Sequence, residues 1–217
     1  EFKSLVNGKD TLVGADIELA KAIGEKLGVK VEFSVMSFDN VLANVQSGKA
    51  DIAIAGISVT DERKKVYDFS DSYYTSENVV IVKKDKVNDY TSTDSLAKQT
   101  VGTQKGSVQE TVAKKQISKA SVVSLTSNGE MINELKSGQL QAVVLEKAIA
   151  EGYIAQNDDL TLANFNLKSD GTDAYAVATR KGSDDLLKEI NAVIKETKDS
   201  GKFDQWLKEA STYKQSK

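Results

Sequence analysis

Cysteine, histidine and proline are all absent from this sequence of 217 residues. Without cysteine the chain can form neither disulfide bonds nor thiolate metal sites, and without histidine it lacks the commonest metal ligand and general base. Arginine is scarce as well, because Arg63 and Arg180 are the only two among 29 basic residues. We therefore expect no metal site, no cofactor and no catalytic residues, and we treat each arginine as a candidate for a role that needs a planar guanidinium.

The charge balance and the hydropathy exclude further classes of protein. The 29 basic residues nearly offset 32 acidic ones, which leaves a formal net charge of -3 and a pI near 5.2. Such a chain has no basic footprint for nucleic acid. No run of about 18 apolar residues occurs, so no segment is expected to span a membrane.

Helix-like and strand-like patterns alternate along the chain. Apolar residues recur at helical spacing over 15–27 until Gly28, and residues 38–45 show helical spacing again. Residues 29–35 alternate like a strand, and 51–55 form a short apolar run typical of a buried strand. This order predicts an α/β fold of two lobes, each a mostly parallel sheet flanked by helices, because 217 residues suit two modest cores.

An internal repeat supports the two-lobed interpretation. Residues 46–55 and 136–145 share a helix end, a glycine and a buried strand. Eight residues beyond that glycine lies Gly56 in the first copy and Glu146 in the second. Both positions follow the carboxyl end of a strand, which is where open α/β sheets bind ligands.

The chain is expected to cross between the lobes twice. One crossing is predicted after the strand-like stretch 79–82, and the other within the apolar stretch 174–179. These positions assign 1–83 to lobe 1, 84–177 to lobe 2 and 178–217 to a return into lobe 1, with a two-strand hinge.

Arg63 is a candidate anion-binding residue. It lies just beyond a buried strand, where Thr60 or Asp61 would cap a short helix. A guanidinium in this place could hold a carboxylate through two charge-assisted hydrogen bonds. An ion pair between Arg63 and a neighbouring surface acid is the alternative.

The second copy of the repeat contains a candidate site of its own. Gly106 is followed by a Ser-x-x-Glu capping box, so the amides near Ser107 and Val108 could receive an anion at a helix N-terminus. The alternative is that this motif only caps its helix. Glu146 supplies an isolated negative charge after the apolar run 142–145.

These groups together complement an α-amino acid. Arg63 and the helix amides would bind the carboxylate, while Glu146, the Gly56 carbonyl and the Ser58 hydroxyl would bind the ammonium. A ligand that lacks either group would leave a charge unpaired in a closed site, at a cost of several kcal/mol. Phe38 could offer its ring to the ligand side chain, or it could belong to the core.

Five sequence blocks, taken in order, resemble one known family. The blocks are Gly14–Ala20, Phe38–Asp39, Ser47–Asp51, Ala55–Arg63 and Phe69–Tyr74. They resemble the polar amino-acid binding proteins of bacterial ABC importers, which have the type II periplasmic-binding-protein fold, and the resemblance covers essentially the whole chain. It implies a protein that binds a ligand by closure of its lobes and that is not an enzyme.

The resemblance also implies roles for individual residues at the ligand backbone. By it, Arg63 and Ser58 hold the α-carboxylate with the amides near Val108, and the Gly56 carbonyl binds the ammonium. Glu146 stands where the family usually has aspartate, and the longer side chain is a departure from the pattern.

The side-chain specificity follows from two further matches. Phe38 matches an aromatic residue that stacks on the ligand side chain, and Gln104 matches a position that tunes specificity. The chain looks most like members that bind arginine or other basic amino acids, with glutamine second. Family members usually have one more strand and an aromatic loop ending just before Glu1, so we expect this sequence to belong to a longer chain.

The resemblance implies two partners, a free L-amino acid and an ABC permease. It also implies a monomeric extracellular or periplasmic protein that is anchored to the membrane as a lipoprotein. Two alternatives stay open from the sequence. One is an enzyme similar to cyclohexadienyl dehydratase, with Glu146 as acid or base, and the other is the ligand-sensing domain of a receptor.

Overall fold

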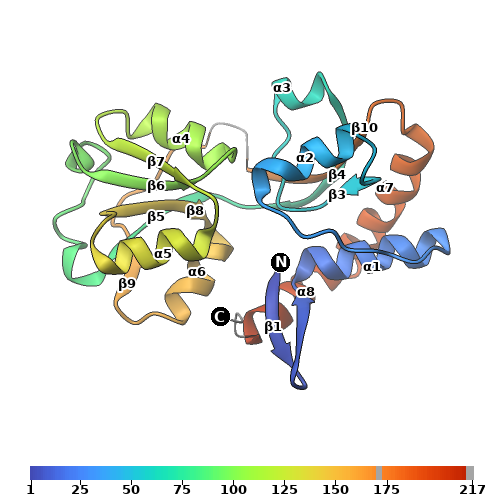
Figure 1. The fold of residues 1–217 in the computed structure, drawn as a ribbon, viewed down its shortest axis with the longest axis horizontal. Coiled ribbons are helices and arrows are strands. Elements are labelled where there is room, and N and C mark those ends of the chain that lie inside the picture. The colour runs from blue at the N-terminus through green and yellow to red at the C-terminus, as the bar shows by residue number, and fades with distance from the viewer. Residues whose placement is uncertain (170–172, 214–217) are drawn as a thin grey trace. The chain divides into compact units, whose positions relative to one another are not determined.

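The computed structural model describes residues 1–169 and 173–213, which form two compact α/β units (Figure 1). Unit 1 comprises Glu1–Val35, Val41–Tyr74 and the C-terminal segment from Ala174. Unit 2 comprises Met36–Asn40 and Thr75–Asp173. The chain therefore has the two-lobed α/β fold that its sequence predicts, with a discontinuous first unit.

Apart from residues 36–40, which are grouped with unit 2, the chain passes between the units at 74/75 and 173/174, whereas we predicted boundaries at 83/84 and 177/178. The difference has its cause in strand pairing. Strand β5 (Asn78–Lys83) pairs with β8 (Ala142–Glu146), so the strand that we assigned to the end of the first part of lobe 1 is an inner strand of unit 2. The second expected crossing lies inside a strand of unit 1, since β10 pairs with β3 there.

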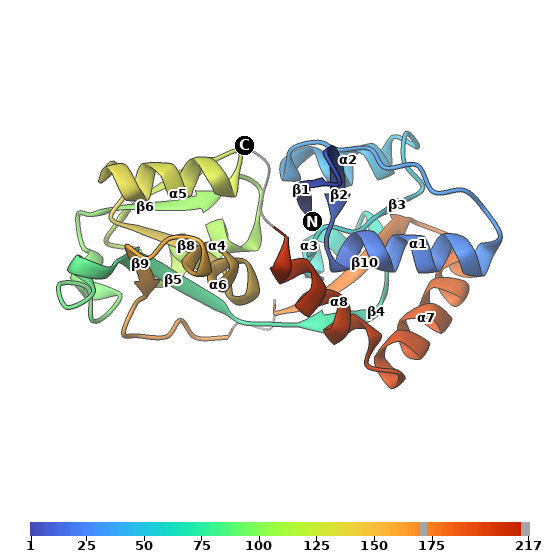
Figure 2. The ribbon, with the colours of Figure 1, turned by 90° about the horizontal axis from the view of Figure 1, so that it is seen from below.

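Unit 1 contains a two-stranded hairpin, a three-stranded sheet in the order β3-β10-β4 and most of five helices. Its elements are β1 (Phe2–Val6), β2 (Lys9–Val13), α1 (Ala15–Leu27), α2 (Phe38–Gln46), β3 (Ile52–Ala53), α3 (Asp61–Lys64), β4 (Tyr67–Thr75), β10 (Ala174–Arg180), α7 (Asp184–Asp199) and α8 (Lys202–Thr212). Figure 2 shows α7 and α8 beside α1, and the core joins Leu19, Val177, Ile190 and Phe203 from these helices and β10.

Helix α1 shows why the sequence pattern is reliable here. Its apolar residues line one face, and Gly28 ends it in the left-handed conformation, which glycine adopts without strain. Gly24 has a packing role, because a Cβ atom there would lie 2.3 Å from a methyl group of Val31. The predicted helix at 15–27 is confirmed.

The strand predicted at 29–35 does not form. Residues 29–37 have no assigned strand or helix, and Val29 and Val35 are 57% and 64% exposed. A strand needs a neighbour for its backbone hydrogen bonds. No strand among the described residues pairs with this segment, so its alternating pattern has no sheet face to bury.

Unit 2 is built on one five-stranded sheet in the order β7-β6-β8-β5-β9. Besides β5 and β8, its elements are η1 (Lys84–Lys86), η2 (Asp94–Leu96), β6 (Thr100–Gln104), α4 (Val108–Gln116), β7 (Ser121–Leu125), α5 (Asn128–Ser137), α6 (Lys147–Ala155) and β9 (Leu160–Leu162). In Figure 1, α4 covers one face of the sheet, and α5 and α6 cover the other. Each face has its own core, with Ala113 of α4 in one and Leu135 of α5 in the other.

The sheet of unit 2 is mixed rather than mostly parallel. In unit 2, β6 pairs in parallel with β7 and β8, whereas β5 pairs antiparallel with β8 and β9. In unit 1, β10 and β3 are antiparallel. The repeated motif forms similar elements in both units, because α2 is followed by Gly48 and β3, and α5 by Gly138 and β8.

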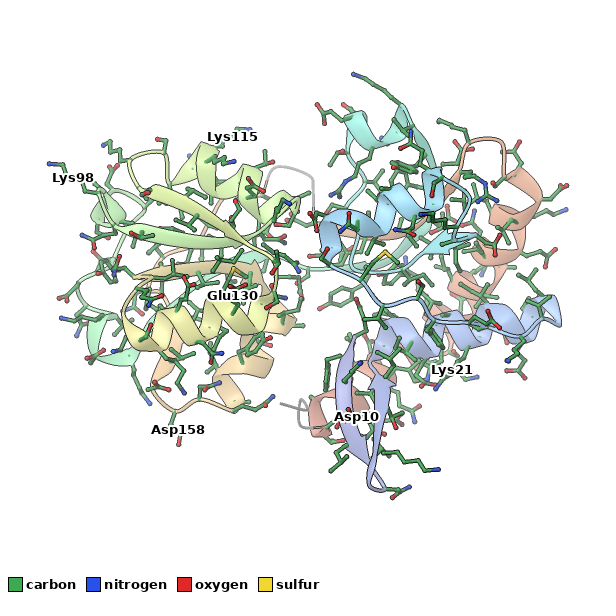
Figure 3. The ribbon with its side chains drawn as sticks, in the orientation of Figure 1. Asp10, Lys21, Lys98, Lys115, Glu130 and Asp158 are labelled. Atoms are coloured by element: carbon green, nitrogen blue, oxygen red, sulfur yellow. The ribbon has the colours of Figure 1, made fainter. Side chains whose placement is uncertain are left out.

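Charged side chains are spread over the surfaces of both units. Figure 3 labels Asp10 and Lys21 on unit 1, and Lys98, Lys115, Glu130 and Asp158 on unit 2. Both signs therefore occur on each unit. Among residues 1–169 and 173–213, no helix has the length and apolar character needed to cross a bilayer.

Candidate functional site

The loop between β3 and α3 carries three of the predicted ligand-binding residues, Gly56, Ser58 and Arg63; we call them the unit 1 site. Gly56 has a positive φ of 59°. Its amide donates to Asp16 Oδ2 and to the Tyr73 hydroxyl, each at 3.2 Å. These two bonds, from α1 and β4, hold the peptide group that leads into Gly56.

Ser58 is 1% exposed and is joined to Tyr175 of β10 by an antiparallel bridge. The Ser58 carbonyl accepts a hydrogen bond of 2.8 Å from Arg63 Nη1. Thr60 caps α3, since its hydroxyl accepts from the Arg63 amide at 3.1 Å. Backbone and side chain of Arg63 are thus both held to the loop that contains Gly56 and Ser58.

The Arg63 guanidinium is only partly exposed. Burial lowers its pKa from the ordinary value, and the interaction with Tyr67 opposes this shift. An arginine stays charged over the physiological range. Unit 1 therefore places one positive planar group against the carbonyl of the buried Ser58, in the same loop as Gly56.

The turn from β6 into α4 carries Gln104, Ser107 and Val108, which with Glu146 form the unit 2 site. Ser107 is the N-cap of α4, because its hydroxyl accepts from the Glu110 amide at 3.3 Å and donates to the Gln104 carbonyl at 2.7 Å. The Glu110 carboxylate accepts from the Gly106 amide at 3.0 Å, which completes a variant of the capping box.

Helix geometry leaves the amides of Val108 and Gln109 without a carbonyl acceptor inside α4. The positive end of the helix dipole lies at the same place. The predicted cap is therefore present, and an N-terminal anion site is compatible with it, because the Ser107 hydroxyl accepts from the Glu110 amide rather than from the amides of Val108 and Gln109.

Glu146 ends β8 and is 5% exposed. Its carboxylate caps α6, since Oε1 accepts from the Ala148 amide at 3.0 Å and Oε2 accepts from the Ile149 amide at 3.2 Å. Oε1 also accepts from the Ser76 hydroxyl. A carboxylate can accept about four hydrogen bonds, so these three leave capacity for one more donor.

Parallel pairing brings the parts of the unit 2 site to one sheet edge. The register Val101↔Ala142 and Gly102↔Val143 aligns β6 with β8, so Gln104 and Glu146 both lie at the carboxyl ends of neighbouring strands. The antiparallel partner of Glu146 on β5 is Asn78. This edge combines a negative charge with the N-termini of two helices.

Phe38 begins α2 and is partly exposed, and the contacts of this helix end are made with unit 2. Asp39, the next residue, pairs with Lys105 at 2.9 Å. A Cβ atom on Gly106 would lie 3.1 Å from the Asp39 Cβ atom. The start of α2, and Phe38 with it, is therefore held against the turn that leads into α4.

Sequence reasoning missed several residues that position the predicted ones. Asp16 and Tyr73 hold Gly56, Ser76 holds Glu146, and Asp39 and Lys105 join α2 to the β6–α4 turn. Asp16, Asp39 and Tyr73 lie in blocks that carry the family resemblance, which is a usable signal. Ser76 and Lys105 have no such signal, because each acts through a partner distant along the chain.

The chemistry available at these sites is ionic recognition and hydrogen bonding. The unit 1 site contains the partly buried positive charge of Arg63, and the unit 2 site contains the buried negative charge of Glu146. Backbone polar groups lie beside each charge. Within the described residues, no cluster of three or more acidic side chains could hold a metal ion.

Comparison with known proteins identifies the family. The profile of the bacterial extracellular solute-binding proteins, family 3, matches residues 2–210. The arginine-binding extracellular protein ArtP of Bacillus subtilis is 34% identical over 204 residues, which cover 92% of this chain and 78% of ArtP.

Two solved structures from Streptococcus pneumoniae are also similar, both of amino acid ABC transporter substrate-binding proteins bound to L-arginine. One, AbpA, is 50% identical with a TM-score of 0.94 and covers 97% of this chain and 88% of its own. The other is 46% identical with a TM-score of 0.97 and covers 100% of this chain and 90% of its own. The chain belongs to the bacterial extracellular solute-binding proteins of family 3.

Proposed function

We propose that this protein is the extracellular substrate-binding component of an amino-acid ABC importer and that it binds arginine or another basic L-amino acid, with glutamine second. The observation that carries the proposal is the pair of opposite charges, Arg63 in unit 1 and Glu146 in unit 2. The bound L-arginine of two structures 50% and 46% identical to this chain supports the choice of ligand.

The ligand carboxylate would be bound by Arg63, Ser58 and the N-terminus of α4 that begins at Ser107 and Val108. A guanidinium matches a carboxylate with two parallel hydrogen bonds, and the amides of a helix N-terminus favour an anion. The guanidinium and the helix amides can bind the same carboxylate at once, because a carboxylate has about four acceptor positions.

The ligand ammonium would be bound by Glu146 and the Gly56 carbonyl. The remaining acceptor capacity of the Glu146 carboxylate suits a donor that brings a positive charge. An uncharged analogue of the amine would leave Glu146 uncompensated in a closed site, which costs several kcal/mol. The protein should therefore reject ligands without an α-amino group.

The side chain of the ligand would meet Phe38 and Gln104. An aromatic face attracts a guanidinium through a cation–π interaction of about 0.5–2 kcal/mol. An amide such as that of Gln104 can hydrogen-bond either a guanidinium or a carboxamide. Arginine gains from both residues and glutamine mainly from the second, which is why we rank arginine first.

Binding would shift the protein to a closed state. If one ligand contacts residues of both units, only the conformation that makes both sets of contacts receives their full free energy. The hinge would then lie in the crossings at 74/75 and 173/174. Closure would form the surface that an ABC permease recognises.

We include the cellular setting in the proposal. The protein would act as a monomer outside the cytoplasmic membrane, held near its permease by a membrane anchor. Size-exclusion chromatography with light scattering would test the monomer, and fractionation of cells would test the anchor. A stable dimer, or a protein found only in the cytoplasm, would contradict this part.

We propose binding without catalysis. A dehydratase would need Glu146 as acid or base, but this carboxylate caps α6 and accepts from Ser76. The rival hypothesis predicts turnover of a cyclic dienyl acid that Glu146→Gln abolishes. Absence of turnover by the wild type would contradict the dehydratase hypothesis.

The deciding experiment is calorimetric titration of the protein with each of the twenty amino acids. We expect L-arginine to bind in the micromolar range or tighter, which corresponds to about -8 kcal/mol. Lysine and glutamine should bind more weakly, and 5-guanidinopentanoate, which is arginine without its α-amino group, much more weakly. Tight binding of an acidic or a large apolar amino acid, with none of arginine, would contradict the proposal.

A further inference from the structure

Ser76 lies between the crossing at 74/75 and the first residues of β5, and it makes two different hydrogen bonds. Its amide donates to the Asp173 carbonyl at 2.9 Å, so it joins the outgoing crossing segment to the returning one. Its hydroxyl donates to Oε1 of Glu146. One residue thus contacts both crossing segments and the buried carboxylate of the unit 2 site.

Neighbouring contacts strengthen this connection. The Lys147 amide donates to the Glu77 carbonyl at 3.0 Å, and the Lys147 ammonium pairs with the Glu77 carboxylate. Asn78 is the strand partner of Glu146. The three residues 76–78 therefore contact 146 and 147 in succession, and the end of β8 is fastened to the crossing segment rather than to β5 alone.

The Ser76 hydroxyl also restricts the Glu146 carboxylate. Without it, Oε1 would keep the Ala148 amide alone, and Oε2 would keep the Ile149 amide. A carboxylate held by two adjacent amides can still tilt about its side-chain torsions, whereas a third donor from another strand fixes its plane. The acceptor position that remains for a ligand is then fixed as well.

We propose that Ser76 is a positioning residue that holds Glu146 ready for the ligand ammonium and transmits occupancy of Glu146 to the hinge. This inference rests on the proposed function, because it assigns the ammonium to Glu146. It extends that function to a residue in the crossing segment itself.

The test compares Ser76→Ala, Ser76→Thr and Ser137→Ala in calorimetric titrations with L-arginine and with 5-guanidinopentanoate. Ser76→Ala keeps the hydrogen bond from the residue 76 amide to the Asp173 carbonyl and removes only the hydroxyl. Ser76→Thr retains a hydroxyl at this position. Ser137 is the control, since its hydroxyl donates to the Glu134 carbonyl in the last turn of α5.

We expect Ser76→Ala to weaken L-arginine binding three- to tenfold, and Ser76→Thr and Ser137→Ala to stay within twofold of the wild type. The analogue without the amine should bind the wild type and Ser76→Ala equally, because it does not use Glu146. An equal loss for both ligands would mean that Ser76 acts only on the general structure, and an unchanged Ser76→Ala would overturn the proposal.

Hydrogen–deuterium exchange tests the link to the hinge. We expect arginine to slow exchange in the peptide spanning 75–83 of the wild type, and this protection should shrink in Ser76→Ala measured at saturating ligand. Equal protection in both proteins would refute the coupling. If the wild type binds no amino acid at all, the proposed function fails instead, so the two failures can be told apart.

Discussion

The unit 1 site and the unit 2 site hold their charged groups in different ways. Arg63 extends from α3, a helix of four residues with none buried, and its Nη1 donates to the Ser58 carbonyl in the preceding loop. Glu146 ends a strand whose five residues are all buried, and three donors hold its carboxylate. The positive charge belongs to a short exposed helix and its loop, whereas the negative charge belongs to the buried sheet of its unit.

This difference indicates how much each charged residue contributes to folding and how much to ligand binding. A charge that caps a helix from a buried position contributes to folding as well as to binding, because its removal leaves donors without an acceptor. A charge on a partly exposed side chain that caps no helix contributes chiefly to binding. Substitutions at Glu146 and Arg63 should therefore differ in their effect on stability more than in their effect on affinity.

The largest effect is expected for Glu146→Leu. The Ser76 hydroxyl and the amides of Ala148 and Ile149 would lose their acceptor, so the free energy of unfolding should fall by about 2–4 kcal/mol. Arginine binding should weaken by about 100-fold or more, a loss of about 2.7 kcal/mol. Urea denaturation and calorimetry would measure the two changes.

The control for this substitution is Glu151→Leu, on an exposed position of α6. It should change the free energy of unfolding by about 0.5 kcal/mol or less. If Glu146→Leu were as stable as this control, the cap would not support α6 and the contrast between the two sites would disappear.

Arg63→Ala should weaken arginine binding about 100-fold, because the charged hydrogen bonds to the ligand are lost, while the loss of the bond to the Ser58 carbonyl should lower the free energy of unfolding by only about 1 kcal/mol. Arg63→Lys keeps the charge but loses the planar fork, so about a tenfold loss is expected. Lys64→Ala, on the next and more exposed residue of α3, is the matched control and should bind normally. Wild-type affinity in Arg63→Ala would remove Arg63 from the site.

Local signals made the helices and their caps predictable. The glycine after α1, the cap of α4 at Ser107 and the repeated glycines before β3 and β8 all depend on residues a few positions apart. The same locality explains why Arg63 and Glu146 could be proposed as candidates. Each follows a recognisable strand at its carboxyl end.

Pairing could not be predicted in the same way. The segment 29–35 has a strand pattern but no strand partner among the described residues. We assigned β5 to lobe 1, although it pairs with β8 and β9 of unit 2. Both facts depend on which strands meet, which periodicity does not encode. The supporting contacts from Asp16 and Ser76 were missed for the same reason, since they join residues 40 and 70 positions apart.

Gly106→Ala should have an intermediate effect. Gly106 has a φ of +75°, and a Cβ atom would lie 3.1 Å from the Asp39 Cβ atom. Gly138 has a φ of +85° and nothing within 4 Å of the same position, so Gly138→Ala measures the backbone strain alone, about 1–2 kcal/mol.

The difference between the two alanine variants isolates the contact with α2. We expect Gly106→Ala to be less stable than Gly138→Ala and to weaken arginine binding several-fold, because the turn that carries Ser107 and Val108 must shift. Thermal melts and calorimetry give both quantities. Equal stability of the two variants would show that the start of α2 moves aside without cost.

The smallest effect concerns the pair of Asp39 and Lys105, which tests whether the start of α2 belongs to the unit 2 site. The hydrogen bond from Ser37 and the pairing with Lys105 lower the pKa of Asp39 below its ordinary value. A carboxyl group whose pKa is lower in the folded state stabilises the fold above its unfolded pKa, and this contribution is lost as the pH falls through the folded pKa. The melting temperature of Asp39→Asn should thus lie below that of the wild type near neutral pH, and the difference should close as the pH falls through the lowered pKa of Asp39.

Salt should narrow the same difference, because Lys105 is largely exposed and its pairing is screened. Asp94→Asn is the control, since Asp94 pairs with Lys119 where both side chains are mostly exposed, and it should change the melting temperature less. An Asp39→Asn variant that keeps wild-type stability at every pH but binds arginine more weakly would mean that the pair orients Phe38 for the ligand rather than supporting the fold. The unit 2 site would then contain a charged pair that serves binding more than folding. Only Glu146 would then distinguish the unit 2 site from the unit 1 site by its contribution to stability.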